Sequence, residues 1–120
     1  ALYTALVHND IDMLVGVFTS EAIAQTFKNE NNPDGRINTI KKYVEILTKD
    51  NTLKDLSYQL KMNKYGSKTN EGVLIFKYEN NEQIKVPFQF EQIEEVHEGE
   101  KSYYIATPLS EIVTAIKNNP

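Results

Sequence analysis

Several residue types that build common functional sites are absent or scarce in these 120 residues. There is no cysteine, which excludes disulfides, thiolate zinc sites, cysteine nucleophiles and thiol redox pairs. Two histidines and five scattered glycines leave little from which to build a metal cluster or a glycine-rich phosphate loop. No apolar run approaches the roughly 20 residues that cross a bilayer. We therefore expect no cofactor and no metal site.

The composition is that of one globular domain, over residues 1–120, with an excess of acid. Hydrophobic residues make up 40% of the chain and charged residues 25%. The net charge is −4 and the pI is about 5.2. This balance argues against binding to nucleic acid or to an anionic membrane, because both need a sustained positive field.

The first part of the chain has the apolar spacing of short helices. Leu2, Ala5 and Leu6 share one helical face, and either Asn9 or Asp10 can cap a second helix. Thr19 or Ser20 can cap a third helix, which a turn-rich segment at 29–35 then ends. A longer amphipathic helix is predicted over about 36–49.

The period changes from 3.6 to 2 near Asn51, which predicts strands from there on. Asn80-Asn81 can supply a tight hairpin turn with a positive φ, and Pro87 indicates an edge or a bulge. Thr107 is expected to cap a last helix that Pro108 starts. The fold class predicted is α+β, with N-terminal helices packed on a curved four-stranded antiparallel sheet and a C-terminal helix.

The inward-facing strand positions are almost all apolar, which predicts a dry, filled interior without a general base. Only Tyr58 and Tyr78 are polar in this register, and no carboxylate lies in it. The apolar positions are Leu56, Leu60, Met62, Leu74, Phe76, Ile84, Val86, Phe88 and Phe90. We therefore expect a protein that is not an enzyme, with no catalytic residue.

Three features of the sequence could carry chemistry, and each also has a simpler interpretation. His8 lies beside Asp10 and Asp12, as in an acid–base pair, but the same residues suit a helix end and the next helix start. His97 lies in an acidic turn, which is usually only solvated. The segment 30–35 matches the start of a calcium loop, but its twelfth position is Lys41 instead of an acid.

The order of the predicted elements resembles the cone-shaped fold of the nuclear-transport-factor-two-like superfamily. The opening residues 5–14, where one helix ends at an acidic residue and a second begins, are similar to that superfamily's start. The resemblance covers about residues 1–107. Enzymes of the superfamily place Asp, His or Tyr inside the cone to move protons, whereas the inward register here has no carboxylate and only Tyr58 and Tyr78 as polar residues.

The closing strands are similar to those of extracytoplasmic domains of type IV secretion assembly factors from Gram-positive conjugative elements. The residues that carry this likeness are 84–90 and 101–109. It implies a non-enzymatic scaffold in a conjugative transfer channel, on the outer face of the cell membrane, with other channel proteins and the domain itself as partners. It also implies a longer protein, tethered by a membrane segment outside this chain. The alternatives are a small-ligand-binding or isomerase-type cone protein, and an accessory domain of a cell-wall enzyme or lipoprotein.

Charge is distributed in blocks along the chain, which predicts a contact surface. Residues 36–68 carry a net charge of +5 and residues 69–100 a net charge of −6. If these blocks separate in space, a basic face and an acidic hairpin are complementary, and weak self-association would depend on salt. The residues expected on this interaction surface are Lys41, Lys42, Lys49, Glu94, Glu95, Glu98 and Glu100.

Overall fold

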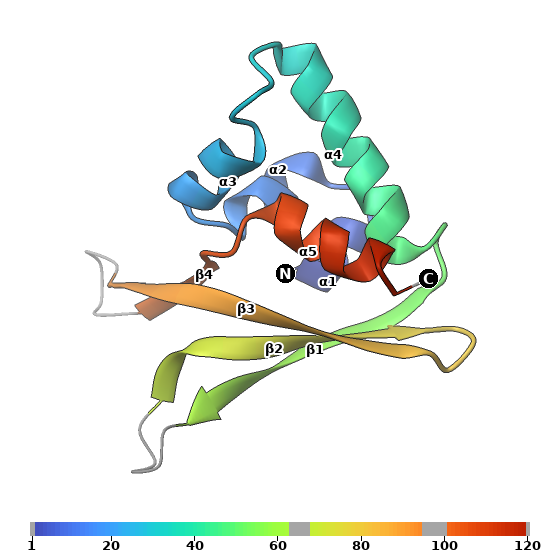
Figure 1. The fold of residues 1–120 in the computed structure, drawn as a ribbon, viewed down its shortest axis with the longest axis vertical. Coiled ribbons are helices and arrows are strands. Elements are labelled where there is room, and N and C mark those ends of the chain that lie inside the picture. Colours follow the sequence, from blue (N-terminus) through green and yellow to red (C-terminus); the bar gives the residue numbers. More distant parts are fainter. Residues whose placement is uncertain (1, 63–67, 95–100, 120) are drawn as a thin grey trace.

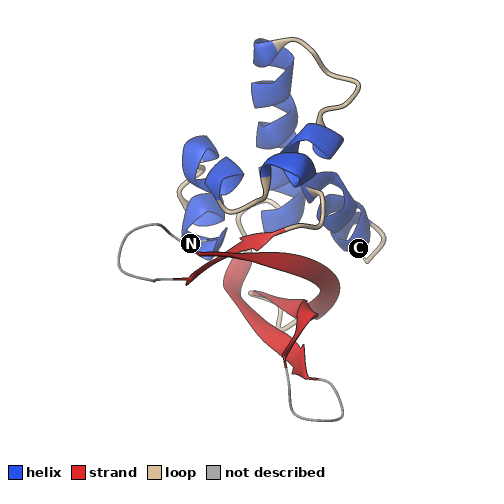
Figure 2. Ribbon diagram, turned by 90° about the vertical axis from the view of Figure 1, so that its left-hand side faces the viewer, coloured by secondary structure: helices blue, strands red, loops and turns tan. Residues whose placement is uncertain are grey.

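The chain forms two layers, a group of helices and a curled sheet. The computed structural model describes residues 2–62, 68–94 and 101–119. Within these residues five helices lie on one side of an antiparallel sheet with the order β1-β2-β3-β4 (Figures 1 and 2). The elements are α1 (Leu2–Val7), α2 (Ile11–Gly16), α3 (Ser20–Thr26), α4 (Pro33–Thr48), β1 (Leu53–Met62), β2 (Lys68–Tyr78), β3 (Gln83–Glu94), β4 (Lys101–Ile105) and α5 (Leu109–Lys117). The predicted α+β class and element order are confirmed.

Side-chain caps separate the first three helices, as the sequence predicts. Asn9 has a positive φ of 53°, and the Asp10 carboxylate then accepts a hydrogen bond from the Met13 N–H at 3.1 Å. The Thr19 hydroxyl accepts one from the Ala22 N–H at 3.1 Å and so caps α3. Between α2 and α3, Phe18 makes a single parallel bridge to Ile105 at the end of β4. This bridge fixes the short helices against the sheet.

Two helix starts differ from the prediction. α4 begins at Pro33, three residues earlier than expected, because Asn32 caps it and proline suits the first helical position. Pro108 is the residue before α5 and not its first residue. The Thr107 hydroxyl does not cap α5, because it accepts a hydrogen bond from the Gln89 N–H of β3 at 2.7 Å. The long-range bond to the sheet replaces the local cap.

The pairing of β1 with β2 has two irregularities that sequence alternation alone misses, one near the start of β1 and one between Leu60 and Met62. Between Leu53 and Asp55 the register with β2 shifts by one residue, which puts Leu53 in the core on the same side as Leu56. Asn81 supplies the positive φ, 68°, of the β2–β3 turn, as expected. β3 has a neighbouring strand on one side only at Pro87, because β4 pairs with it from Phe90 onward, so the predicted edge position is confirmed.

The core lies between the helices and the face of the sheet turned toward them. Sheet residues Phe76, Ile84 and Val86 pack in one buried cluster with Leu14 and Leu47 of the helices. Leu109, Ile112, Val113 and Ile116 of α5 join the same cluster. At roughly 1.5–3 kcal/mol for each fully buried aliphatic or aromatic side chain, this contact accounts for most of the favourable free energy of folding.

A buried hydrogen bond joins the helix layer to the sheet where α4 turns into β1. Tyr78 of β2 is only 1% exposed, and its hydroxyl donates a hydrogen bond of 2.7 Å to the Leu47 carbonyl in the last turn of α4. Burial raises the pKa of this hydroxyl, and the charge of Glu82 raises it further. The neutral hydroxyl therefore satisfies a carbonyl that the helix itself leaves without a partner.

The substitution Tyr78→Phe removes this hydroxyl and leaves the ring in place. We expect a loss of about 1–3 kcal/mol in the free energy of unfolding, because a buried carbonyl loses its donor. Urea denaturation followed by circular dichroism measures it. The matched control is Tyr58→Phe, whose ring is exposed, and it should change stability by less than about 0.5 kcal/mol. Equal effects of the two substitutions would contradict the assigned role of the Tyr78 hydroxyl.

Candidate functional site

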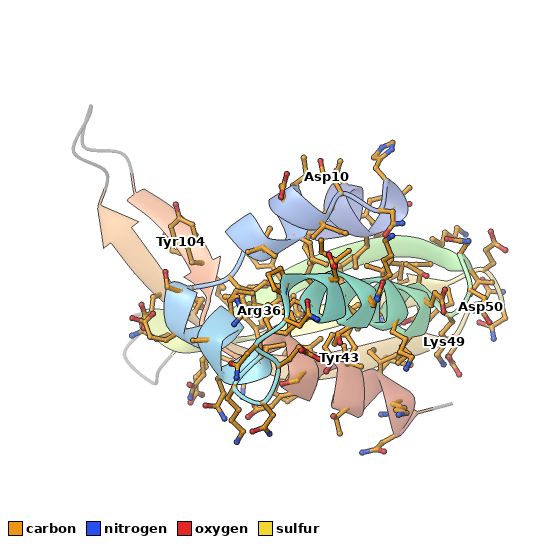
Figure 3. All side chains as sticks on the ribbon, turned by 90° about the horizontal axis from the view of Figure 1, so that it is seen from above. Asp10, Arg36, Tyr43, Lys49, Asp50 and Tyr104 are labelled. Atoms are coloured by element: carbon orange, nitrogen blue, oxygen red, sulfur yellow. The ribbon has the colours of Figure 1, made fainter. Side chains whose placement is uncertain are left out.

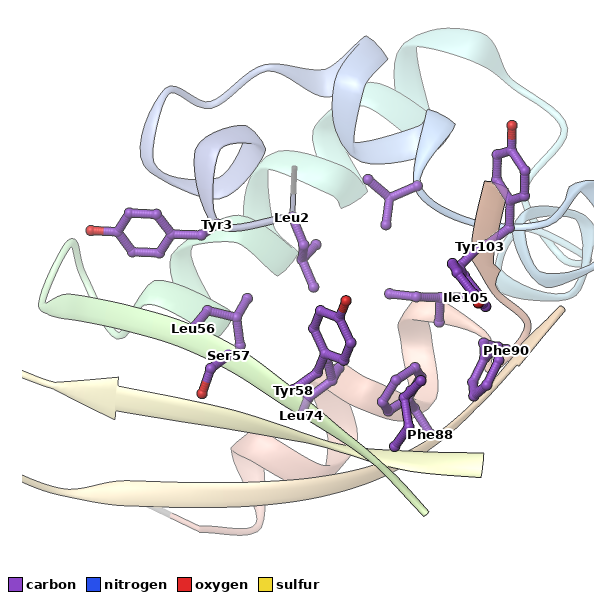
Figure 4. A pocket seen from close by; sticks show the side chains of 13 residues that line it. Leu2, Tyr3, Leu56, Ser57, Tyr58, Leu74, Phe88, Phe90, Tyr103 and Ile105 are labelled. Atoms are coloured by element: carbon purple, nitrogen blue, oxygen red, sulfur yellow. The ribbon is translucent and has the colours of Figure 1, made fainter. Parts of the chain in front are cut away.

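The helices leave one end of the inner sheet face uncovered, and a pocket of about 260 Å³ lies there. Its walls come from the start of α1, from Val17 and from all four strands (Figure 4). Leu56 and Leu60 of β1 and Phe88 and Phe90 of β3 provide much of the apolar lining. The expectation of a completely filled interior is therefore wrong, because the helices pack over the other end of the sheet.

Two tyrosines on the inner face border this pocket and are largely exposed. Tyr58 of β1 is 64% exposed and Tyr103 of β4 is 51% exposed. Figure 4 shows the Tyr58 ring rising from β1 toward Leu2 and Ile105, with its hydroxyl in the space between them. The Tyr103 ring packs edge-on against Phe90, with 5.5 Å between ring centroids. Tyr58 and Tyr103 thus form an aromatic rim.

The lining provides apolar surface and hydroxyl groups and no acid, base or fixed charge. Among the described residues that line the pocket none is Asp, Glu, His, Lys or Arg. Ser57 lies on β1, but its side chain points away from the pocket in Figure 4. General acid–base catalysis most often uses His, Asp, Glu or Lys, and the described lining contains none of these. This arrangement suits the binding of an apolar or aromatic group.

A glycine in β2 shapes the floor of the pocket. Gly72 pairs with Leu60 of β1 and with Phe88 of β3. A Cβ atom at Gly72 would lie 2.7 Å from the Gln59 carbonyl oxygen and 2.8 Å from the Phe88 ring. The absence of a side chain at this position lets the Phe88 ring lie over the strand as part of the lining.

Sequence analysis predicted one of the two rim tyrosines. Tyr58 and Tyr78 were both expected on the inner face at one end, and both face inward. Only Tyr58 lines the pocket, because Tyr78 is buried under α4 with its hydroxyl bonded to the Leu47 carbonyl. Tyr103 was not expected at the site, although its alternation with Ile105 is a signal that could have indicated it.

The structure places the residues expected on the charged interaction surface as follows. Lys41 and Lys42 are exposed on α4. Lys49 lies at the end of that helix, where its ammonium forms an ion pair with Glu82 and donates a hydrogen bond of 2.8 Å to the Asn119 carbonyl (Figure 3). Glu94 ends β3, and Glu95, Glu98 and Glu100 lie outside the described residues.

The histidines and acids considered for catalysis or metal binding lie at helix ends or outside the described residues. His8 is exposed just after α1, Asp10 caps α2, and Asp12 lies in the first turn of α2. His97 lies outside the described residues. Within the described part of the chain no group of three or more His, Asp or Glu side chains could hold a metal ion. No helix described there has the length and hydropathy needed to span a bilayer.

Comparisons with protein-family models, with curated proteins and with solved structures found no match for this chain. The pocket and the exposed strands around it are therefore the observations from which a function has to be inferred.

The substitution Gly72→Ala tests the pocket floor. The new methyl group would press on a backbone carbonyl and on the Phe88 ring, so we expect a loss of about 1–3 kcal/mol in the free energy of unfolding. Gly16→Ala is the matched control, because nothing lies within 4 Å of a Cβ atom there, in the last residue of α2. It should leave stability unchanged or raise it by up to about 1 kcal/mol. Thermal or urea unfolding measures the stability of both variants. A Gly72→Ala variant as stable as the unmodified chain would contradict the described packing.

Proposed function

We propose that this domain is a non-enzymatic assembly domain of a conjugative type IV secretion channel. Its pocket receives an apolar or aromatic side chain of a neighbouring channel protein. The observation that carries the proposal is the tyrosine-rimmed pocket, whose described lining offers no acid or base. The resemblance of residues 84–90 and 101–109 to the closing strands of such factors supports the choice of channel and the outer face of the membrane as the location.

The residue types and the size of the pocket are typical of a site that binds a side chain of another protein. Tyrosine is enriched among the residues that dominate interface energies, because it buries a large rigid ring and keeps a polar tip. A volume of about 260 Å³ lies just below the range of pockets that enclose drug-sized ligands. A single large side chain, anchored between Tyr58 and Tyr103, is an occupant of suitable size and chemistry.

The test is Tyr58→Ala in the native host. Because Tyr58 is largely exposed, the free energy of unfolding should change by less than about 0.5 kcal/mol. Truncation of a central interface tyrosine costs about 2 kcal/mol of binding, roughly thirtyfold in affinity, so plasmid transfer should fall sharply. The control is Lys85→Ala, an exposed position on β3 outside the pocket lining.

A photo-reactive residue at position 58 identifies the neighbour directly. We expect cross-links to proteins encoded with the transfer genes, and none of them from the same residue at position 85. Unchanged transfer in Tyr58→Ala, or cross-linking that is the same at both positions, would overturn the proposal.

A second candidate, a small-ligand-binding protein, is favoured by the apolar pocket and by the Tyr58 hydroxyl that points into it. It is tested by titrating the domain with 4-methylphenol and following backbone amide shifts by NMR. Saturable shifts confined to the pocket residues, weakened in Tyr58→Phe, would support this candidate. Shifts that do not saturate would rule it out and leave the assembly function.

A further inference from the structure

β1 is an edge strand, and the middle of its outer edge is open. The sheet order is β1-β2-β3-β4, so β1 has a strand on one side only. At its start the edge is covered, because the Tyr3 hydroxyl donates a hydrogen bond of 3.0 Å to the Lys54 carbonyl. From Asp55 to Leu60 no described group outside the sheet bonds to the backbone. Open strand edges are templates for pairing with another strand.

The hydrogen bonds of the neighbouring strands show which β1 residues face outward. The Tyr78 N–H donates to the Glu82 carbonyl, so Tyr78 directs its backbone groups toward β3. Alternation then turns Ile75 toward its partner Ser57, and the next β1 residue, Tyr58, toward the free edge. The same alternation directs the backbone groups of Gln89 away from β2. On that side its N–H donates to the Thr107 hydroxyl and its carbonyl accepts from the Ala106 N–H, as the alternation requires. Leu56, Tyr58 and Leu60 therefore present the free backbone groups.

The sequence of this edge is self-complementary about Tyr58. A twofold axis at Tyr58 places Asp55 of one copy opposite Lys61 of the other, at both ends of the paired stretch. It also places Leu56 opposite Leu60 and Ser57 opposite Gln59. Opposite charges and matched apolar side chains in directly opposed positions stabilise antiparallel pairs.

Other registers lose this match. Outward-facing residues must oppose outward-facing residues, so the axis has to pass through a residue and not between two. An axis at Ser57 puts Asp55 opposite Gln59, and an axis at Gln59 puts Ser57 opposite Lys61. Neither of these joins opposite charges. Tyr58 is thus the centre at which the backbone pattern and the side-chain charges agree.

We propose that β1 pairs with β1 of a second copy of this chain, antiparallel and centred on Tyr58. The two sheets then form one continuous sheet of eight described strands, with the outward N–H and carbonyl groups of Leu56, Tyr58 and Leu60 bonded across the axis. Lys61 already lies 4.0 Å from Glu71 of its own chain, and with 52% of its side chain exposed it has room for the Asp55 carboxylate as well. This inference goes beyond the proposed function and depends on β1 alone.

The charge pattern provides a test that is specific for the register. Asp55→Lys alone puts like charges opposite each other at both ends, and so does Lys61→Asp alone. We expect each variant to raise the dimer dissociation constant by about tenfold, since the two end pairs change from attraction to repulsion. A 1:1 mixture of the two variants restores both pairs as Lys opposite Asp, and should dimerise at least as tightly as the unmodified chain. Sedimentation equilibrium measures all three.

The matched controls carry the same changes of net charge on β3. Glu91→Lys and Lys85→Asp are both exposed and lie away from the β1 edge, so they should leave dimerisation unchanged, alone or mixed. Hydrogen exchange gives a second readout that does not depend on charge. The amides of Leu56, Tyr58 and Leu60 should become protected as concentration rises, while those of Ser57 and Gln59 keep their protection.

Three results would overturn the proposal: a chain that stays monomeric at millimolar concentration, a mixture that associates no better than its components, or protection that does not alternate. A monomer whose β1 amides become protected only with a channel protein would instead assign this edge to a foreign strand. The dimer tests change positions 55 and 61, which lie outside the pocket lining. At position 58, a cross-link to a second copy of the chain reports on the dimer and a cross-link to another protein reports on the assembly function, so the two failures can be told apart.

Discussion

The structure depends on the junction between α4 and β1, where helix and sheet are held together at one corner. Lys49, Asp50 and Asn51 have φ values of 45°, 59° and 68°, a left-handed run that costs free energy at each residue. Contacts from three distant segments offset this cost. The Tyr78 hydroxyl bonds to Leu47, Glu82 pairs with Lys49, and the Asn119 carbonyl accepts from Lys49. The hairpin between β2 and β3 and the end of α5 are thereby fixed to the same corner.

Away from this junction the helices cover less of the inner sheet face, although Ile105 of β4 still bonds to Val17 and Thr19 of the helical layer. Tyr78 at the junction is fully buried, whereas Tyr58 and Tyr103 lie far along the curled strands with more than half of their surface exposed. The apolar face continues beyond the helices, so part of it becomes a pocket. Packing at the junction and the open binding surface are two consequences of the same geometry.

The sequence predicts the helices and strands well, because each has its own hydrophobic period. It predicts the site poorly, because the part of the sheet that the helices cover is set by residues far apart in the sequence. Alternation over 56–60 and 84–90 indicates the inner face correctly, and Asp10 and Thr19 cap the helices as expected. Alternation cannot indicate where the helices stop covering that face. It therefore does not distinguish Tyr58, which is exposed, from Tyr78, which is buried. The bulge at Lys54 and the bond from Gln89 to Thr107 are likewise set by distant residues. The charged surface and the channel assignment stay predictions.

The two outer edges of the sheet differ in how their backbone groups are bonded, and this difference bears on assembly. At the β4 edge, Ile105 bonds to Val17 and Thr19, so a turn of the helical layer takes the place of a further strand. At the β1 edge Tyr3 covers Lys54, and the six residues beyond it, Asp55 to Leu60, pair in regular register with β2. Charges at the ends of an edge strand usually discourage pairing, because most registers bring like charges or a charge and an apolar group together. On β1 the charges at the two ends have opposite signs and lie at equal distances from Tyr58. Such an arrangement favours the symmetric register centred on Tyr58 over the neighbouring ones, which converts protection against aggregation into selection of a single partner.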